Sequence, residues 1–195
     1  MEIRRAHAED LPAIAQTLHE AFRQDPISTW VFPGEDTFEA HHPTLMRMFL
    51  DAALAGGEVY LTPGAHGVAL WYTVAPDEHD EAGLVDAIAA AVGPSGSRVR
   101  ALDAVFAARH PAGVAHLYLH LLAVRPAYQG HGIGAALLAD RLAWADKEGL
   151  PAYLESSSPR SAALYARQGF AHQESLTLPE SGPTIFPMWR APVTG

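Results

Sequence analysis

The feature of this chain that most restricts its fold is a glycine-rich turn between a strand pattern and a helix pattern. Residues 116–124 form a nearly continuous apolar run, and after a short break they are followed by Gln129-Gly130-His131-Gly132-Ile133-Gly134-Ala135. The periodicity of residues 132–148 predicts a helix, and residues 152–155 predict the next strand. Strand, helix and strand in this order predict a parallel strand pair with a right-handed crossover. We therefore expect an α/β fold built on a mixed sheet.

The remaining patterns extend this interpretation over all 195 residues. Further helices are expected over residues 9–24, 38–55, 80–92, 97–109 and 159–168. Further strands are expected over residues 3–5, 58–61, 68–74, 184–190 and near 170–177. Residues 27–36 are rich in turn formers and are expected to form a loop. No change of composition marks a linker, so residues 1–195 are expected to form a single domain.

Composition excludes several classes of function. The chain has no cysteine, which excludes disulfides, thiolate metal sites and a cysteine nucleophile. The formal net charge is 13 − 22 = −9 with no cluster of Lys and Arg, which argues against nucleic acid and anionic membranes as partners. No leader pattern or long apolar run is present, so a cytoplasmic protein is expected. The adjacent His41 and His42 are expected on the surface, and no metal site is expected.

The glycine turn predicts a site for a phosphate or diphosphate, because glycines let backbone N–H groups approach a ligand and a helix start carries partial positive charge. Gly130, Gly132 and Ala135, with Glu155 downstream, also satisfy a relaxed dinucleotide-binding pattern. Residues 125–129 separate this turn from the strand, and only 40 residues follow Glu155. Both facts disfavour a dinucleotide-binding fold, so a nicotinamide oxidoreductase is kept only as a minor hypothesis.

Two motifs in order carry a family resemblance. Val124-x-Pro126-x-x-Gln129-Gly130-x-Gly132-x-Gly134 resembles motif A of the GNAT superfamily of N-acetyltransferases. Residues 155–170, with Tyr165 four residues before Gly169-Phe170, resemble motif B. Within the family, residues 116–170 are similar in detail to puromycin N-acetyltransferase and its bacterial relatives. The resemblance implies a GNAT fold, a mixed sheet with splayed central strands and helices on both faces.

The resemblance also implies a function. It implies that acetyl-CoA is the co-substrate and that its acetyl group passes to a primary amine of a small molecule by direct attack in a ternary complex. The residues implied to bind acetyl-CoA are Leu122, Ala123, Val124, Gln129, Gly130, His131, Gly132, Ile133, Gly134, Ala135, Ser158, Ser161 and Tyr165. The family usually carries Asn where this chain has Ser158, which leaves open a non-catalytic acyl-CoA-binding sensor on the same fold. A homodimer is compatible with either function.

Candidate catalytic residues follow from the chemistry of acetyl transfer. The resemblance implies that Tyr165 is the general acid for the leaving thiolate. Glu155 and Tyr118 are the preferred candidates for the general base, ahead of His120. Strand alternation, in the absence of a bulge, places His116, Tyr118, His120, Leu122 and Val124 on one face. An acceptor pocket for a cationic amine is expected from Asp25, Trp30, Phe32, Trp71 and Tyr72.

Overall fold

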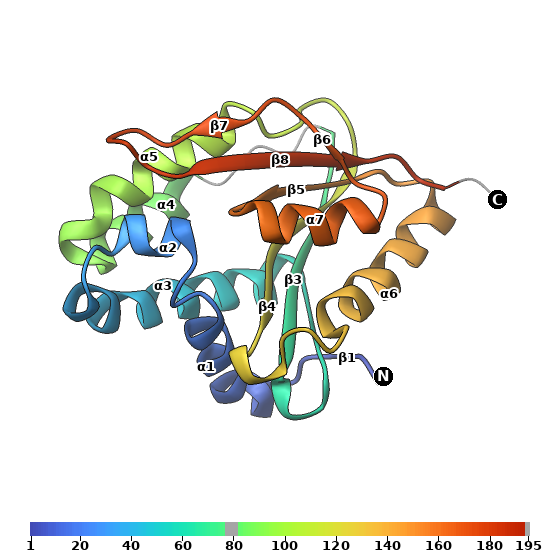
Figure 1. The fold of residues 1–195 in the computed structure, drawn as a ribbon, viewed down its shortest axis with the longest axis horizontal. Coiled ribbons are helices and arrows are strands. Elements are labelled where there is room, and N and C mark those ends of the chain that lie inside the picture. The colour runs from blue at the N-terminus through green and yellow to red at the C-terminus, as the bar shows by residue number, and fades with distance from the viewer. Residues whose placement is uncertain (77–81, 194–195) are drawn as a thin grey trace.

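A mixed sheet organises the computed structural model, which describes residues 1–76 and 82–193. Within these residues eight strands follow the order β1-β2-β3-β4-β5-β8-β6, with β7 paired to β8 (Figure 1). The strands are β1 (Arg4–Arg5), β2 (Glu58–Leu61), β3 (Gly67–Val74), β4 (His116–Val124), β5 (Ala152–Ser156), β6 (Ala171–His172), β7 (Leu176–Thr177) and β8 (Thr184–Arg190). In these residues β4 and β5 are parallel, as expected, and the other pairs are antiparallel.

Helices cover both faces of the sheet, as predicted. One face carries α1 (Leu11–Ala21), α2 (Pro26–Val31), α3 (Glu35–Gly56), α4 (Ala82–Ala91) and α5 (Gly96–Ala107). The other face carries α6 (Ile133–Glu148) and α7 (Pro159–Arg167). Short 3-10 helices are η1 (Ala8–Asp10), η2 (Pro63–Ala65), η3 (Gly93–Ser95) and η4 (Pro126–Tyr128). Two apolar cores result, one between the sheet and α1–α5 and one between the sheet and α6–α7.

One expected loop contains a helix. Residues 27–36 were expected to be irregular, whereas α2 occupies residues 26–31. The carboxylate of Asp25 accepts hydrogen bonds from the backbone N–H groups of Ile27 (2.9 Å) and Ser28 (3.1 Å), and Pro26 stands at the first helical position. Both features stabilise a helix start, because they satisfy or remove N–H groups that lack helical partners. The Asp-Pro pair that ends the preceding helical pattern therefore also begins the next helix.

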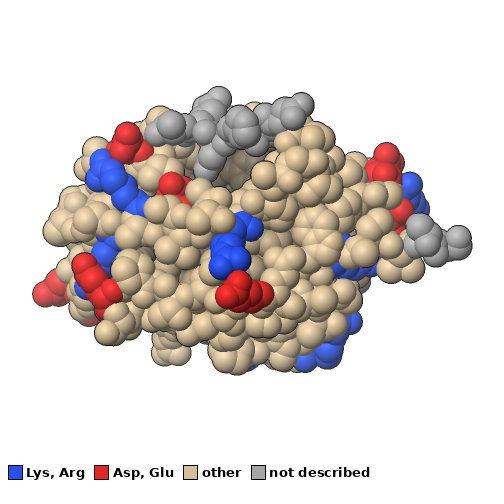
Figure 2. Space-filling model, turned by 90° about the horizontal axis from the view of Figure 1, so that it is seen from above, with Lys and Arg blue, Asp and Glu red and all other residues tan. Residues whose placement is uncertain are grey.

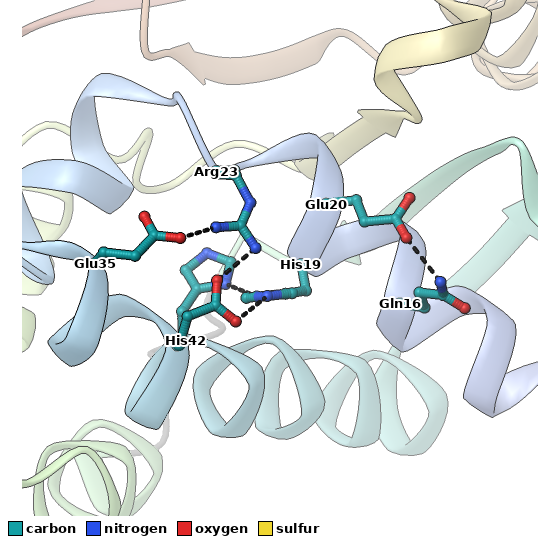
Figure 3. Close-up of polar contacts among 7 residues, drawn as sticks. Gln16, His19, Glu20, Arg23, Glu35 and His42 are labelled. Carbon is teal, nitrogen blue, oxygen red and sulfur yellow. Dashed lines mark hydrogen bonds and ion pairs between the residues drawn. The ribbon is translucent and has the colours of Figure 1, made fainter.

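The expectation that His41 and His42 lie together on the surface is wrong for His42. Its side chain is fully buried, and its ring stacks on Phe38 at a centroid distance of 4.2 Å. Neighbouring residues of a helix point about 100° apart, so the two histidines cannot share a face. His42 lies on the inner side of α3, where its Nδ1 is 3.0 Å from Nδ1 of His19 on α1 (Figure 3).

On the face in Figure 2, blue and red side chains lie near one another in small groups of both signs. None of the described helices has the length and apolar character needed to cross a lipid bilayer. Within residues 1–76 and 82–193, His, Asp and Glu do not gather into a group of three that could hold a metal ion.

Candidate active site

The parallel strands β4 and β5 separate part-way along their length. Their ladder joins residues 117–119 to residues 152–154 and ends at the pair Leu119–Leu154. Beyond it, β4 continues beside β3 as far as Val124, and β5 continues beside β8 as far as Ser156. Figure 1 shows β4 running toward the lower part of the view while β5 lies across its upper part. The edge of β4 at residues 122–124 can therefore pair with another extended chain.

A β-bulge lies where the separation begins. Leu119 pairs with Trp71 of β3 and Leu121 pairs with Leu70, so His120 is an extra residue on β4. A bulge bends its strand and increases the local twist. The extra residue also shifts the alternation of side chains along β4.

The bulge overturns the expectation that alternate residues from 116 to 124 share a face. Leu122 and Val124 pack against the core beneath α6. His120 contacts Phe49 and Tyr72 on the opposite face, at centroid distances of 4.7 Å and 5.8 Å. The separated strands therefore have apolar side chains on one side and polar rings on the other.

The glycine turn leads from β4 into α6 with its backbone exposed. Gly130 and Gly132 have φ values of +79° and +78°, in the region that favours glycine, and a Cβ at either would meet no heavy atom within 4 Å. Gly132 is the N-cap of α6, so no side chain caps the first N–H groups of this 16-residue helix. The Gln129 side chain points back into the turn, where Nε2 donates to the Val124 carbonyl at 3.1 Å. The open backbone fits a phosphate or diphosphate.

The start of α7 is held by serines that the sequence assigned to ligand binding. Ser158 is the N-cap, and its Oγ accepts a hydrogen bond from the Ser161 N–H at 3.2 Å. The Ser161 hydroxyl lies 2.8 Å from Ser158 Oγ and 2.7 Å from Ser156 Oγ. These hydroxyls thus stabilise the first turn of the helix. Contact of Ser158 and Ser161 with a ligand stays a prediction.

Tyr165 of α7 is 8% exposed and packs near Phe170, at a centroid distance of 6.1 Å. Burial raises the pKa of its phenol, and the charge of Asp25 raises it further. The phenol is therefore protonated at neutral pH and can donate a proton. Asp25 also accepts a hydrogen bond from the Ser157 hydroxyl, and burial raises the pKa of this carboxyl. This contact joins the start of α2 to the turn between β5 and α7.

Glu155 lies on β5 directly after the last pair with β4. Its side chain is 2% exposed, and Oε1 has no hydrogen-bond partner among the described residues. Tyr118 lies one pair earlier on β4, with its ring 6.1 Å from that of Tyr153. Its hydroxyl is 3.5 Å from Nδ1 of His120, whose pKa burial lowers to about 4. The structure thus gathers the three predicted base candidates on one side of the sheet.

Comparisons with known proteins agree with this geometry. Residues 98–170 match the model of the Acetyltransferase (GNAT) family. A solved structure from Corynebacterium glutamicum, described as histone acetyltransferase HPA2 and related acetyltransferase, is 26% identical and has a TM-score of 0.75, covering 99% of this chain and 97% of its own. The chain has the GNAT acetyltransferase fold. The predicted fold class and the resemblance to this family are confirmed.

Two further structures share the GNAT fold at lower identity. Agmatine N-acetyltransferase is 18% identical with a TM-score of 0.72, and the match covers 97% of this chain and 98% of that one. Arylalkylamine N-acetyltransferase 2 from Aedes aegypti is 13% identical with a TM-score of 0.69, covering 98% and 99% of the two chains. At these identities the likeness concerns the fold alone. A specific closeness to puromycin N-acetyltransferases stays a prediction.

One residue near Glu155, His110, is not marked by the sequence. His110 lies between α5 and β4, and its Nδ1 is 3.8 Å from Glu155 Oε1. Its ring lies edge-on to Tyr118 and Tyr153, at centroid distances of 4.8 Å and 5.2 Å. No motif or periodicity marks this histidine, because its position depends on how the segment before β4 folds back on the sheet.

The five residues expected to line an acceptor pocket do not come together. Trp71 is fully buried in the core beneath α6, whereas Phe32 is 1% exposed in the core on the other face. Tyr72 reaches the rings around His120. Of the expected lining, Tyr72 has ring contacts with two base candidates, Tyr118 and His120.

Proposed function

We propose that this protein transfers an acetyl group from acetyl-CoA to a primary amine of a small molecule, by direct attack in a ternary complex. One observation carries the proposal: the separated edges of β4 and β5 lead directly to an open glycine turn at the start of α6. A strand edge offers hydrogen bonds to the amides of an extended chain, and the turn offers N–H groups to a diphosphate. Acetyl-CoA has both parts in that order.

The chain's backbone fits this co-substrate. The residues that would hold the pantetheine amides are Leu122, Ala123 and Val124, which lie beyond the end of the β4–β5 ladder. The N–H groups of residues 130–135 would hold the diphosphate, because Gly130 and Gly132 leave open space on this side of the turn. When bound, acetyl-CoA supplies the activated thioester. The net charge of −9 makes these local N–H groups necessary, since the overall field disfavours an anion.

Tyr165 serves as the general acid in this proposal. Its phenol stays protonated at neutral pH because burial and Asp25 both raise its pKa. As the C–S bond breaks, the phenol donates its proton to the thiolate, and the phenolate is reprotonated from the amide nitrogen that forms. The hydroxyl is the group that makes this transfer, so Phe at this position would lose it.

Glu155 serves as the general base. An alkyl amine has a pKa near 10 and is an ammonium at neutral pH, so it must lose a proton before it can attack. The position of Glu155 supports this role, because Glu155 lies at the separation of the strands and has a buried carboxylate oxygen without a hydrogen-bond partner in the described part of the chain. Tyr118 and His120, on the same side, are the alternatives.

Release of free thiol from acetyl-CoA tests the proposal. Because the chain has no cysteine, a thiol-reactive dye reports only the CoA released. The amine panel should include agmatine, arylalkylamines, polyamines and puromycin. The first two occur in the names of proteins with the same fold. We expect at least one amine to release thiol, with initial-rate lines that intersect as a ternary complex requires.

A matched pair of variants isolates Tyr165. Tyr165→Phe should lower kcat by about 100-fold, with KM for acetyl-CoA little changed. Tyr60→Phe removes the same hydroxyl from β2 and should have the wild-type rate. Wild-type turnover by a folded Tyr165→Phe protein would remove Tyr165 from the mechanism.

Two binding results would overturn the proposal as a whole. Acetyl-CoA binding without turnover of any amine would support an acyl-CoA sensor on the same fold. A thermal shift with NAD(P) and none with acetyl-CoA would support the oxidoreductase reading of the glycine turn. A thermal-shift assay measures the binding of acetyl-CoA and of NAD(P), and thiol release over the amine panel measures turnover.

A further inference from the structure

A chain of ring nitrogens leads from the backbone to Glu155. His116 is fully buried, and its Nδ1 is 2.9 Å from the carbonyl oxygen of Val114. Because a carbonyl oxygen only accepts, Nδ1 of His116 is the donor. The Nε2 of His116 lies 3.1 Å from Nε2 of His110, and Nδ1 of His110 lies 3.8 Å from Glu155 Oε1.

Donor and acceptor rules set which ring nitrogens of this chain donate. A neutral His116 with its proton on Nδ1 accepts at Nε2, so Nε2 of His110 donates. The Nδ1 of His110 is then left to face Glu155 Oε1 at 3.8 Å, the distance of an ion pair and not of a direct hydrogen bond. Nδ1 therefore lies where a proton shared with the Glu155 carboxylate would bind.

The pair has a buried member and an exposed member. The side chain of Glu155 is 2% exposed, whereas that of His110 is 28% exposed. A proton taken up by Glu155 can therefore reach water through His110. Among the described residues, the charged and titratable groups around the pair include His116, Tyr118 and His120 of β4, Tyr153 of β5, and Arg109, which is ion-paired with Glu174.

We propose that His110 is a positioning residue that shares one proton with Glu155, holds it as a carboxylate toward the acceptor amine, and releases to water the proton that Glu155 takes. The inference rests on the proposed function. The N–H bond of the ammonium breaks and its electron pair stays on nitrogen. The proton bonds to the Glu155 carboxylate, and an equivalent proton leaves His110 for water, so charge and protons balance.

Histidine NMR tests the shared proton without any acetyl transfer. The ring signals of His110 are followed against pH in the wild type and in Glu155→Gln. We expect the ring signals of His110 to follow a different course with pH in the two proteins, because only the wild type has a carboxylate facing Nδ1 of His110. The exposed His172 of β6 provides the control signal and should titrate alike in both proteins. Equal His110 titrations in the two proteins would overturn the proposal.

Kinetics test the consequence for the reaction. In His110→Asn the amide N–H can still donate to Glu155, but it holds no dissociable proton. We expect kcat to fall about tenfold or more, an altered pH profile of kcat/KM, and KM for acetyl-CoA within about twofold of wild type. His172→Asn is the matched control. A wild-type pH profile in folded His110→Asn would show that the histidine does no more than pack.

The NMR titration and the kinetics distinguish failure of the proposed function from failure of the proposed role of His110. A wild-type protein that transfers acetyl to no amine ends the proposed function, whereas the NMR titration still decides whether His110 and Glu155 share a proton. An active wild type with unlinked titrations ends the role of His110 alone.

Discussion

Among the residues that the structure describes, two pairs of histidines lie nitrogen to nitrogen, and they differ in the contacts that they make next. His19 and His42 meet between α1 and α3 with Nδ1 atoms 3.0 Å apart. His110 and His116 meet beside β4 with Nε2 atoms 3.1 Å apart. The local geometry is nearly the same, so the difference lies in what each pair contacts next.

The His19–His42 pair, which we call the closed pair, has a further polar partner at each end. Nε2 of His42 lies 3.3 Å from the Ser28 hydroxyl, and Nε2 of His19 lies 3.4 Å from a carboxylate oxygen of Glu39. Arg23 in turn forms an ion pair with Glu39. Burial, then the charges of His19 and Arg23, lower the pKa of His42 to about 3. This pair is neutral at His42 and serves packing.

The second pair is open at one end. It ends at Glu155, whose Oε1 has no hydrogen-bond partner in the part of the chain that the structure describes. A buried histidine pair with a partner at each end holds helices together, and we propose that the pair that ends at the Glu155 carboxylate serves proton transfer.

Glu155→Gln is the change that tests this comparison most strongly. We expect kcat/KM to fall by about 10²- to 10⁴-fold, because the amide cannot take the proton of the amine. The thermal midpoint should stay near that of wild type, since Gln fills the same space. Thiol release and thermal melts measure both, with Glu174→Gln at an exposed carboxylate as control. Wild-type activity in Glu155→Gln would show that the His110–His116 pair, like the His19–His42 pair, does not serve proton transfer.

His42→Ala should have the opposite effect. The free energy of unfolding should fall by about 2–4 kcal/mol, because the change removes a buried ring stacked on Phe38 and leaves Nδ1 of His19 without the contact to His42. KM for acetyl-CoA should not change. Urea denaturation measures the loss, and His41→Ala, the next residue along the chain, is the control. A large loss of kcat in His42→Ala, with an unchanged free energy of unfolding, would contradict the assignment of the His19–His42 pair to packing.

The closed pair should also make stability depend on pH. The unfolded chain protonates His42 near its ordinary pKa of 6.5, whereas the folded protein resists protonation down to about 3. The unfolded state therefore binds more protons between these values, and the free energy of unfolding falls as the pH drops through that window. Between pH 7 and pH 4 the contribution of His42 is about 2–3 kcal/mol. Urea midpoints should show a shallower pH slope in His42→Ala than in wild type.

The smallest expected effect concerns the exposed end of the closed pair. Glu39→Gln keeps an oxygen that accepts from His19 but removes the charge beside Arg23. Because this carboxylate is 44% exposed, the free energy of unfolding should change by less than about 1 kcal/mol. Glu35→Gln, also paired with Arg23, is the control for lost charge. A loss as large as that of His42→Ala would show that the ion pairs, not the rings, hold α1 to α3.

The sequence predicts the elements of this fold well where the signal is local. The expected strand over residues 116–124 has the same bounds in the structure, and the helix over residues 132–148 differs by one residue. The expected helix over residues 80–92 corresponds to α4, although residues 80 and 81 lie outside the described part. The prediction of a loop over residues 27–36 was wrong, because the Asp25 side chain caps α2 and stabilises a helix despite the turn formers.

The candidate site is harder to predict because its geometry is not local. The bulge at His120 depends on the pairing of β4 with β3, which no pattern within β4 reveals. His110 depends on the path of the chain between α5 and β4. Glu155, Tyr118 and Tyr165 could be named because motifs mark them, but their catalytic roles stay predictions.

The bulge at His120 has a consequence for insertions and deletions. Without His120, Leu119 and Leu122 would be separated by one residue and would still face α6, so β4 would alternate regularly and keep its core side chains. The strand would lose the bend that a bulge introduces, just where β4 leaves β5. Deletion of the single codon for His120 would therefore give a regular strand without the bend at which β4 leaves β5.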